Sequence, residues 1–172
     1  MIRMLLAALV LGGCVAHTGA SSPYAGQESR EIKALSAEER DSLVSGKGMG
    51  FAKAAELNGY PGPAHVLALA GELRLNEAQR RDTQALFTAM ESRAITLGKE
   101  LVEEERRLDR LFADRAATRE SVAASLERIG ALQAKVRGAH LDAHLEQVRI
   151  LSAEQVARYV QLRGYSAHAG HH

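Results

Sequence analysis

The segments Leu75-Asn76-Glu77-Ala78-Gln79 and Leu151-Ser152-Ala153-Glu154-Gln155 bracket most of the second half of the chain. In each, an Asn or Ser is followed three residues later by a Gln, which is the pattern of a helix capping box. The short polar side chain accepts a hydrogen bond from a backbone N–H of the first turn, and the Gln accepts one from the N–H of the cap residue. Each segment therefore predicts the start of a helix. A looser third copy, Leu35-Ser36-Ala37-Glu38-Glu39, predicts another start.

Two long helices are predicted between the Gln-bearing segments, over Glu77 to about Ala113 and over Arg119 to Ile150. Apolar residues recur on the first at helical spacing, namely Leu86, Met90, Leu97, Leu101, Leu108 and Leu111. Because the turn at 114–118 is short, the two helices should be antiparallel neighbours. A final helix is expected over Ala153 to Arg163. The predicted fold class is all-α, a long antiparallel helical hairpin with short flanking helices.

The short flanking helices are expected in residues 35–75. Ser36 should cap a helix through Val44, and a second should cover Phe51 to Leu57. The segment Asn58-Gly59-Tyr60-Pro61-Gly62-Pro63 is dense in turn residues, and Pro63 suits the first turn of a third helix, expected to run to about Leu73. Residues 35–165 therefore form one helical domain.

The composition is that of an all-helical protein with little obvious catalytic chemistry. Of 172 residues, 4% are aromatic, none is Trp and only three are Pro. The net charge is +1 and no basic stripe is interleaved with aromatic side chains, which argues against nucleic acid as a partner. The GKGMG segment at 46–50 lacks the spacing of a phosphate-binding loop, and no Ser-His-Asp or Cys-His nucleophile set can be proposed.

The first 14 residues predict export. Arg3 precedes an apolar run from Leu5 to Leu11, which is too short to span a bilayer and resembles a secretory signal. Leu11-Gly12-Gly13-Cys14 then resembles a bacterial lipobox, in which Cys14, the chain's only cysteine, would be lipidated. The alternative is an ordinary signal peptide cut further on. Residues 15–34 are small and polar and are expected to form a flexible tether, so membrane attachment would be by the lipid anchor alone.

A hairpin of this length is only two helices wide and cannot cover its own apolar face. The short N-terminal helices can cover part of that face. A second copy of the chain is the usual way to cover the rest, so we expect a homodimer.

The two Gln-bearing segments also carry a resemblance to a known family. LNEAQR at 75–80 and LSAEQV at 151–156 resemble the repeated LTxxQ-like motif of the Spy/CpxP family of periplasmic chaperones, whose fold superfamily includes heavy-metal sensors and zinc-resistance proteins of the CnrX and ZraP kind. The resemblance covers about Leu75 to Tyr165, together with the secretion signal, and the stretch 48–73 resembles the segment that precedes the hairpin. Asn76 stands where Thr or Ser is usual, and Asn caps a helix equally well.

This resemblance implies a cradle-shaped antiparallel dimer in the periplasm, without enzyme activity. It implies binding of unfolded envelope proteins, or of metal ions linked to stress signalling. A third role, as an adaptor on a membrane sensor protein, stays open. The mixed acidic and basic residues of the hairpin do not by themselves indicate a basic client-binding surface, and are as well explained by a solvated helix face.

Histidines provide the candidate metal ligands. His140 and His144 lie four residues apart, so both imidazoles should lie on one face of the return helix, toward the apolar seam and opposite Met90. Zinc prefers four ligands, so this is an incomplete site for Zn, Ni or Cu, and two buried, hydrogen-bonded histidines are the alternative. In the tail at 166–172, His168, His171 and His172 could bind these metals weakly, or the tail could be unstructured and without a ligand. No cofactor is required by either interpretation.

Overall fold

The computed structural model describes residues 21–165, and over that range the regular secondary structure is all helix, without strands. The helices are α1 (Ala37–Val44), α2 (Lys53–Glu56), α3 (Pro63–Ala68), α4 (Glu77–Ala113), α5 (Arg119–Ile150) and α6 (Ala153–Leu162). Within these residues no helix is long and apolar enough to cross a bilayer. The predicted all-α class and the order of the helices are confirmed, whereas the homodimer remains a prediction.

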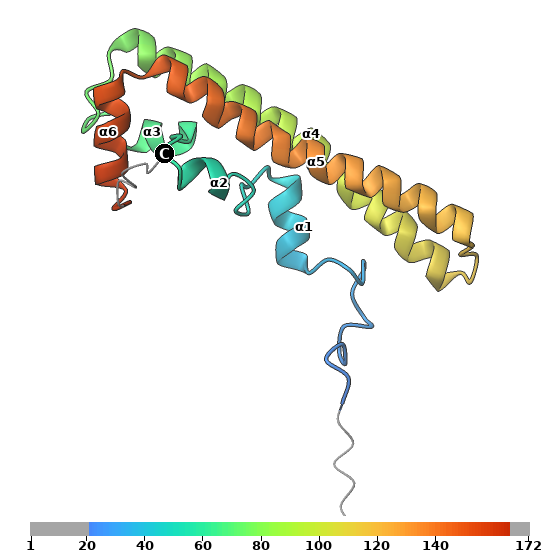
Figure 1. Ribbon diagram of the computed structural model, residues 1–172. Coiled ribbons are helices and arrows are strands. Elements are labelled where there is room, and N and C mark those ends of the chain that lie inside the picture. Colours follow the sequence, from blue (N-terminus) through green and yellow to red (C-terminus); the bar gives the residue numbers. More distant parts are fainter. Residues whose placement is uncertain (1–20, 166–172) are drawn as a thin grey trace, which may run out of the picture.

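Helices α4 and α5 form the predicted antiparallel hairpin (Figure 1). Helix α4 has 37 residues and is therefore about 55 Å long. Polar contacts define the register along it: Thr83 accepts from Gln147 at 3.1 Å, and Arg93 pairs with Asp142 at 3.0 Å. Buried aliphatic side chains fill the seam between the helices, including Leu101, Val102, Ile129, Leu132 and Val136.

Capping boxes start four of the six helices of the described chain. The three predicted boxes, Ser36–Glu39, Asn76–Gln79 and Ser152–Gln155, are all formed in both directions. A fourth box, Thr118–Ser121, starts α5 and was not predicted, because Ser121 stands where the capping-box pattern has Glu or Gln. The local sequence pattern therefore fixes where the two halves of the hairpin and the final helix begin.

The two capping glutamines also join the ends of the hairpin. The Gln79 Nε2 donates to Gln155 Oε1 at 2.8 Å, and the Gln155 Nε2 donates to Gln79 Oε1 at 3.0 Å. Each amide nitrogen donates a second bond across the base, Gln79 to the carbonyl of Ile150 and Gln155 to the carbonyl of Leu73. Leu75 and Leu151, which open the two segments, are buried beside this pair in a second core with Val66 and Tyr159.

The short helices lie along one side of the hairpin, and α6 lies across its base (Figure 1). Helix α1 packs closely on α4: the Gly98 Cα faces the backbone of Leu43, and a Cβ at this position would lie 2.7 Å from the carbonyl carbon of Leu43. Helix α2 contacts α5, and α3 contacts both long helices. The loop end of the hairpin projects beyond α1, so the flanking helices cover only part of it.

Two regions differ from the sequence-based expectation. Helix α3 ends at Ala68 and not near Leu73, because Leu69 leaves helical geometry and residues 69–74 continue as turns that contain Gly71. Leu73 is nevertheless buried, which explains the helix-like apolar pattern there.

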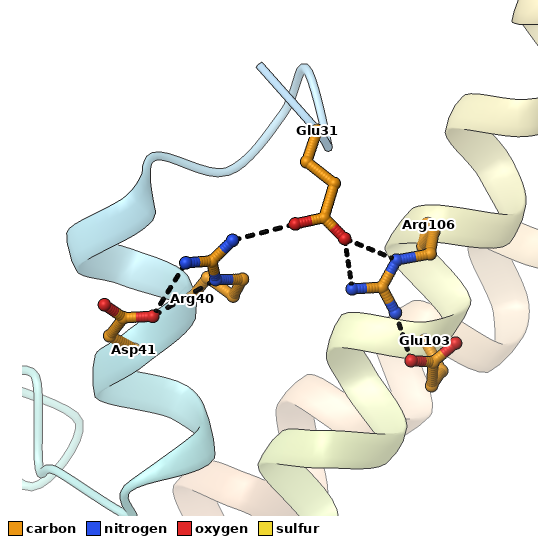
Figure 2. A network of polar contacts seen from close by, with 5 residues as sticks. All are labelled: Glu31, Arg40, Asp41, Glu103 and Arg106. Atoms are coloured by element: carbon orange, nitrogen blue, oxygen red, sulfur yellow. Dashed lines mark hydrogen bonds and ion pairs between the residues drawn. The ribbon is translucent and has the colours of Figure 1, made fainter.

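The end of the expected tether at 15–34 packs on the hairpin. Ile32 is 2% exposed and belongs to the main core, and the backbone N–H of Lys33 donates to Asp109 at 3.0 Å. Figure 2 shows the polar part of this contact, in which the Glu31 carboxylate accepts from Arg106 of α4 and from Arg40 of α1, both at 2.8 Å. The folded domain therefore begins before residue 35. The signal at 1–14, including Cys14, lies outside the described residues.

Candidate functional site

A cavity of about 540 Å³ lies between the hairpin and the short helices. Its walls come from six parts of the chain: the Gly-rich loop 45–50, α2, the start of α3, one turn of α4, one turn of α5, and Tyr165. Both predicted histidines, His140 and His144, line it, as does Met90, the residue expected to face them. The predicted inward orientation of the two histidines is confirmed, since they are only 5% and 9% exposed.

The imidazole of His144 is held in a defined orientation. Its Nδ1 lies 2.7 Å from the carbonyl oxygen of Tyr60, and because a carbonyl can only accept, Nδ1 carries the proton. In the neutral ring Nε2 then keeps a free lone pair, which is the usual arrangement of a metal-ligating histidine. Gly62 makes room for this ring, because a Cβ there would lie 2.9 Å from Cε1 and 3.0 Å from Nε2.

His140 presents an unpaired nitrogen. Its ring stacks on Phe51 with a centroid distance of 5.9 Å, and its Nε2 is buried with no hydrogen-bond partner. A buried polar atom without a partner is uncommon and requires an explanation. Burial lowers the pKa of His140, and the neighbouring His144 lowers it further, so the ring is neutral at pH 7. A neutral imidazole is the form that binds metals.

A buried carboxylate, Glu56 of α2, lies next to the two histidines. Its Oε1 accepts from the hydroxyl of Tyr159 at 2.6 Å and from the hydroxyl of Tyr165 at 2.9 Å. Its Oε2 is buried without a hydrogen-bond partner and lies 3.8 Å from His144 Nδ1. His65 Nδ1 is 3.3 Å from Oε1, so the carboxylate lies beside His65 as well as His144.

Glu56 is held as an anion. Burial alone would raise its pKa, but the hydrogen bonds from Tyr159 and Tyr165 outweigh burial and lower the pKa. Burial, together with the Glu56 carboxylate, raises the pKa of Tyr159 far above its ordinary value, so its hydroxyl stays a donor. Arg163 Nε also donates to Oε1 at 3.3 Å, so the site combines a Glu56–Arg163 ion pair with two buried imidazoles.

The described residues supply only part of a metal coordination sphere. Within residues 21–165, no group of three or more His, Cys, Asp or Glu side chains is placed to hold a metal ion. The two imidazoles are suitable ligands for Zn, Ni or Cu, and Met90 and Glu91 line the same cavity. The predicted ligands His168, His171 and His172 lie outside the described residues.

The sequence did not identify Glu56 and Tyr165 as site residues, because Glu56 is 103 residues from Tyr159 and 109 residues from Tyr165 in the chain. The predicted turn at 58–63 was a usable sequence signal for the site, because the carbonyl of Tyr60 in that turn accepts from His144. Neither a scan of protein-family models nor searches of curated proteins and of solved structures found a match to this chain.

Proposed function

We propose that this chain is a non-enzymatic, exported stress-protection protein that binds a transition-metal ion, Zn, Ni or Cu, in the cavity beneath the hairpin. The observation that carries the proposal is the pair of histidines in one cavity: His144 with its Nε2 free, and His140 with a buried Nε2 that has no partner. A bound cation would give the His140 nitrogen the partner that it lacks.

The surroundings of the pair favour a cation. The Glu56 carboxylate is ionised and has one buried oxygen without a hydrogen-bond partner. Arg163 pairs with the other oxygen at 3.3 Å, so the attraction that Glu56 offers a cation comes from Oε2. The carbonyl of Tyr60 orients His144 in the way that outer-shell acceptors orient metal-ligating histidines.

The direct test is calorimetric titration of the processed protein with Zn(II), Ni(II) or Cu(II) at neutral pH. His140→Ala and His144→Ala should each weaken binding by roughly tenfold or more, as loss of a ligand or its orientation does in metal sites. Glu146→Ala is the matched control, since it removes an exposed carboxylate two residues after His144 that pairs with Arg149 of the same helix. Unchanged affinity in the His140→Ala/His144→Ala double variant would refute the metal proposal.

A second candidate function, binding of unfolded envelope proteins, is favoured by exposed apolar side chains on the hairpin. Phe112 is 60% exposed near the loop end, and Leu126 and Leu145 are exposed on α5. Apolar side chains that protrude from a helical surface suit weak contact with an unfolded chain. Suppression of the aggregation of an unfolded protein without ATP tests this role, and Phe112→Ser/Leu126→Ser should reduce it. A protein without any suppression would not be a chaperone of this kind.

The remaining parts of the proposal concern assembly and location. We propose that the exported chain is anchored in the periplasm by a lipid on Cys14, and that the uncovered part of the hairpin pairs with a second copy of the chain. Mass spectrometry of the membrane fraction tests the lipid, and light scattering tests the dimer. An unlipidated Cys14, or a monomer at all concentrations, would contradict these two points separately.

A further inference from the structure

A buried carboxylate of α4, that of Glu105, has no partner within the described part of the chain. It is the last of three consecutive glutamates, and the first two are paired. Glu103 pairs with Arg106, as Figure 2 shows, and Glu104 pairs with Arg128 at 2.8 Å. Glu105 is only 9% exposed, and burial alone raises its pKa, with no neighbouring charge to oppose it. Because ionisable side chains are rarely buried without a partner, this one requires an explanation.

The side chain of Glu105 lines a groove of about 520 Å³. The groove lies between α1, the loop that precedes α2, and the two helices of the hairpin. Its apolar lining consists of Leu35, Leu43, Met49, Phe51 and Leu101. Of the residues that line the groove, Met49 alone also lines the metal cavity, so the two sites are separate. A volume of this size is within the range of ligand-binding sites.

The groove is open to solvent along α5. Gly130 and Ala134, one turn apart on that helix, line it and are exposed. A Cβ built on Gly130 would meet no atom within 4 Å. Small residues let another backbone approach closely, so an incoming chain has room to lie against α5 and to reach Glu105.

The charges in the groove favour a cation. Besides Glu105, two charged side chains line it, Glu39 and Arg137. The Glu39 carboxylate accepts from the backbone N–H of Ser36 at 2.8 Å, and this bond lowers its pKa, so it is ionised. The exposed Arg137 forms no ion pair with either carboxylate in the described chain. Two carboxylates against one guanidinium leave a site that is complementary to a positive charge.

We propose that this groove binds a segment of another protein in which a Lys or Arg is flanked by apolar residues, with the basic side chain paired to Glu105. The aliphatic stem of Lys or Arg packs on apolar surface while its charge reaches a polar partner, which suits a carboxylate beside Leu43 and Leu101. Because Glu105 is already removed from water in the free protein, binding adds only the desolvation of the incoming cation. Met49, which is 43% exposed, offers an adaptable contact to the flanking apolar residues. The inference does not depend on metal binding.

The experiment titrates the full processed protein into short fluorescent peptides and follows their anisotropy. One peptide has a central Lys between leucines, and its matched form has Gln in place of the Lys. The unaltered protein should bind the Lys peptide roughly tenfold or more tightly than the Gln peptide, as expected for a hydrogen bond to a charged group. Glu105→Gln keeps the shape of the side chain and removes its charge, so it should abolish this preference. Glu103→Gln, which removes an exposed and paired carboxylate of α4, is the matched control and should leave the preference unchanged.

Two further variants separate the outcomes. Glu105→Gln should unfold at a temperature no lower than the unaltered protein, because a buried charge without a partner is destabilising, so a lost preference is not a folding defect. Ala134→Trp should fill the groove and weaken binding of the Lys peptide.

Equal affinity for the Lys and Gln peptides, or a Lys preference that survives Glu105→Gln, would overturn the proposal. Displacement of the Lys peptide by hexylamine at equal concentration would show that the ligand is a small amine and would overturn the peptide assignment. Conversion of a dimer into a monomer by Ala134→Trp would show that a second copy of the chain occupies the groove, with the same consequence. Zn(II) affinity should be the same in Glu105→Gln as in the unaltered protein, so failure here leaves the metal proposal to its own test.

Discussion

The reciprocal pair of glutamines at the base of the hairpin should make a large, measurable contribution to stability. Each amide of Gln79 and Gln155 uses both of its donors and accepts two hydrogen bonds, one of them from its own cap residue. A typical intramolecular hydrogen bond contributes about 0.5–1.5 kcal/mol, so the two bonds between the amides should appear as a coupling energy of about 1–3 kcal/mol. Each single Gln→Ala substitution should lower the free energy of unfolding by about 2–4 kcal/mol. It removes, in addition, the hydrogen bond to the N–H of the cap residue and the hydrogen bond to the carbonyl of Ile150 or Leu73.

The assay is a double-mutant cycle of Gln79→Ala and Gln155→Ala, with urea unfolding followed by circular dichroism at one fixed protein concentration. Gln84→Ala, on the exposed face of α4, is the matched control and should change stability by less than about 0.5 kcal/mol. The effects of the two substitutions should be clearly less than additive in the double variant. Additivity to within about 0.5 kcal/mol would show that the two amides do not interact, and would refute the proposed link between the two capping segments.

Three further predictions concern single positions. Gly98→Ala should destabilise the protein by about 1–3 kcal/mol, since its Cβ would overlap the backbone of Leu43, whereas Gly130→Ala, with open space around it, should stabilise it by up to about 1 kcal/mol. Thermal unfolding of both variants measures the two changes in stability. Changes of the same sign would contradict the packing of α1 on α4. Gly62→Ala should displace the His144 ring and weaken Zn(II) binding while far-UV circular dichroism stays unchanged, and equal affinity would contradict the orientation of that ring. The pKa of Glu56 is lowered from 4.5 in the folded state, so its contribution to stability is fully present above that value and is lost as the pH falls through the folded pKa. The free energy of unfolding, measured from pH 6 to pH 3, should therefore fall less steeply with acid for Glu56→Gln than for the unaltered protein. Parallel dependences on pH would contradict the ionised state of Glu56.

The sequence was informative where structure is decided locally. A capping box involves residues three apart, so Asn76 and Ser152 predicted the starts of α4 and α6, and the short turn between long apolar patterns predicted the antiparallel hairpin. The inward orientation of His140 and His144 followed from helical periodicity alone. The predicted end of α3 was wrong, because the apolar residues beyond Ala68 are buried without being helical.

The site could be predicted only in part, because its other members come from distant parts of the chain. The partners of Glu56 lie in and beyond α6, and only tertiary packing of α2 against that end of the chain brings them together. The role of Gly62 depends equally on the position of α5. A single apolar residue in a polar stretch, Ile32, likewise gave no periodic pattern from which its burial could be predicted.

The most direct test of metal binding in the cavity is a crystal structure of the processed protein grown with zinc, with an anomalous difference map at the zinc edge. The predicted result is a peak in the cavity, about 2.0–2.1 Å from the Nε2 atoms of both His140 and His144. An empty cavity beside a zinc peak on surface histidines alone would contradict the account.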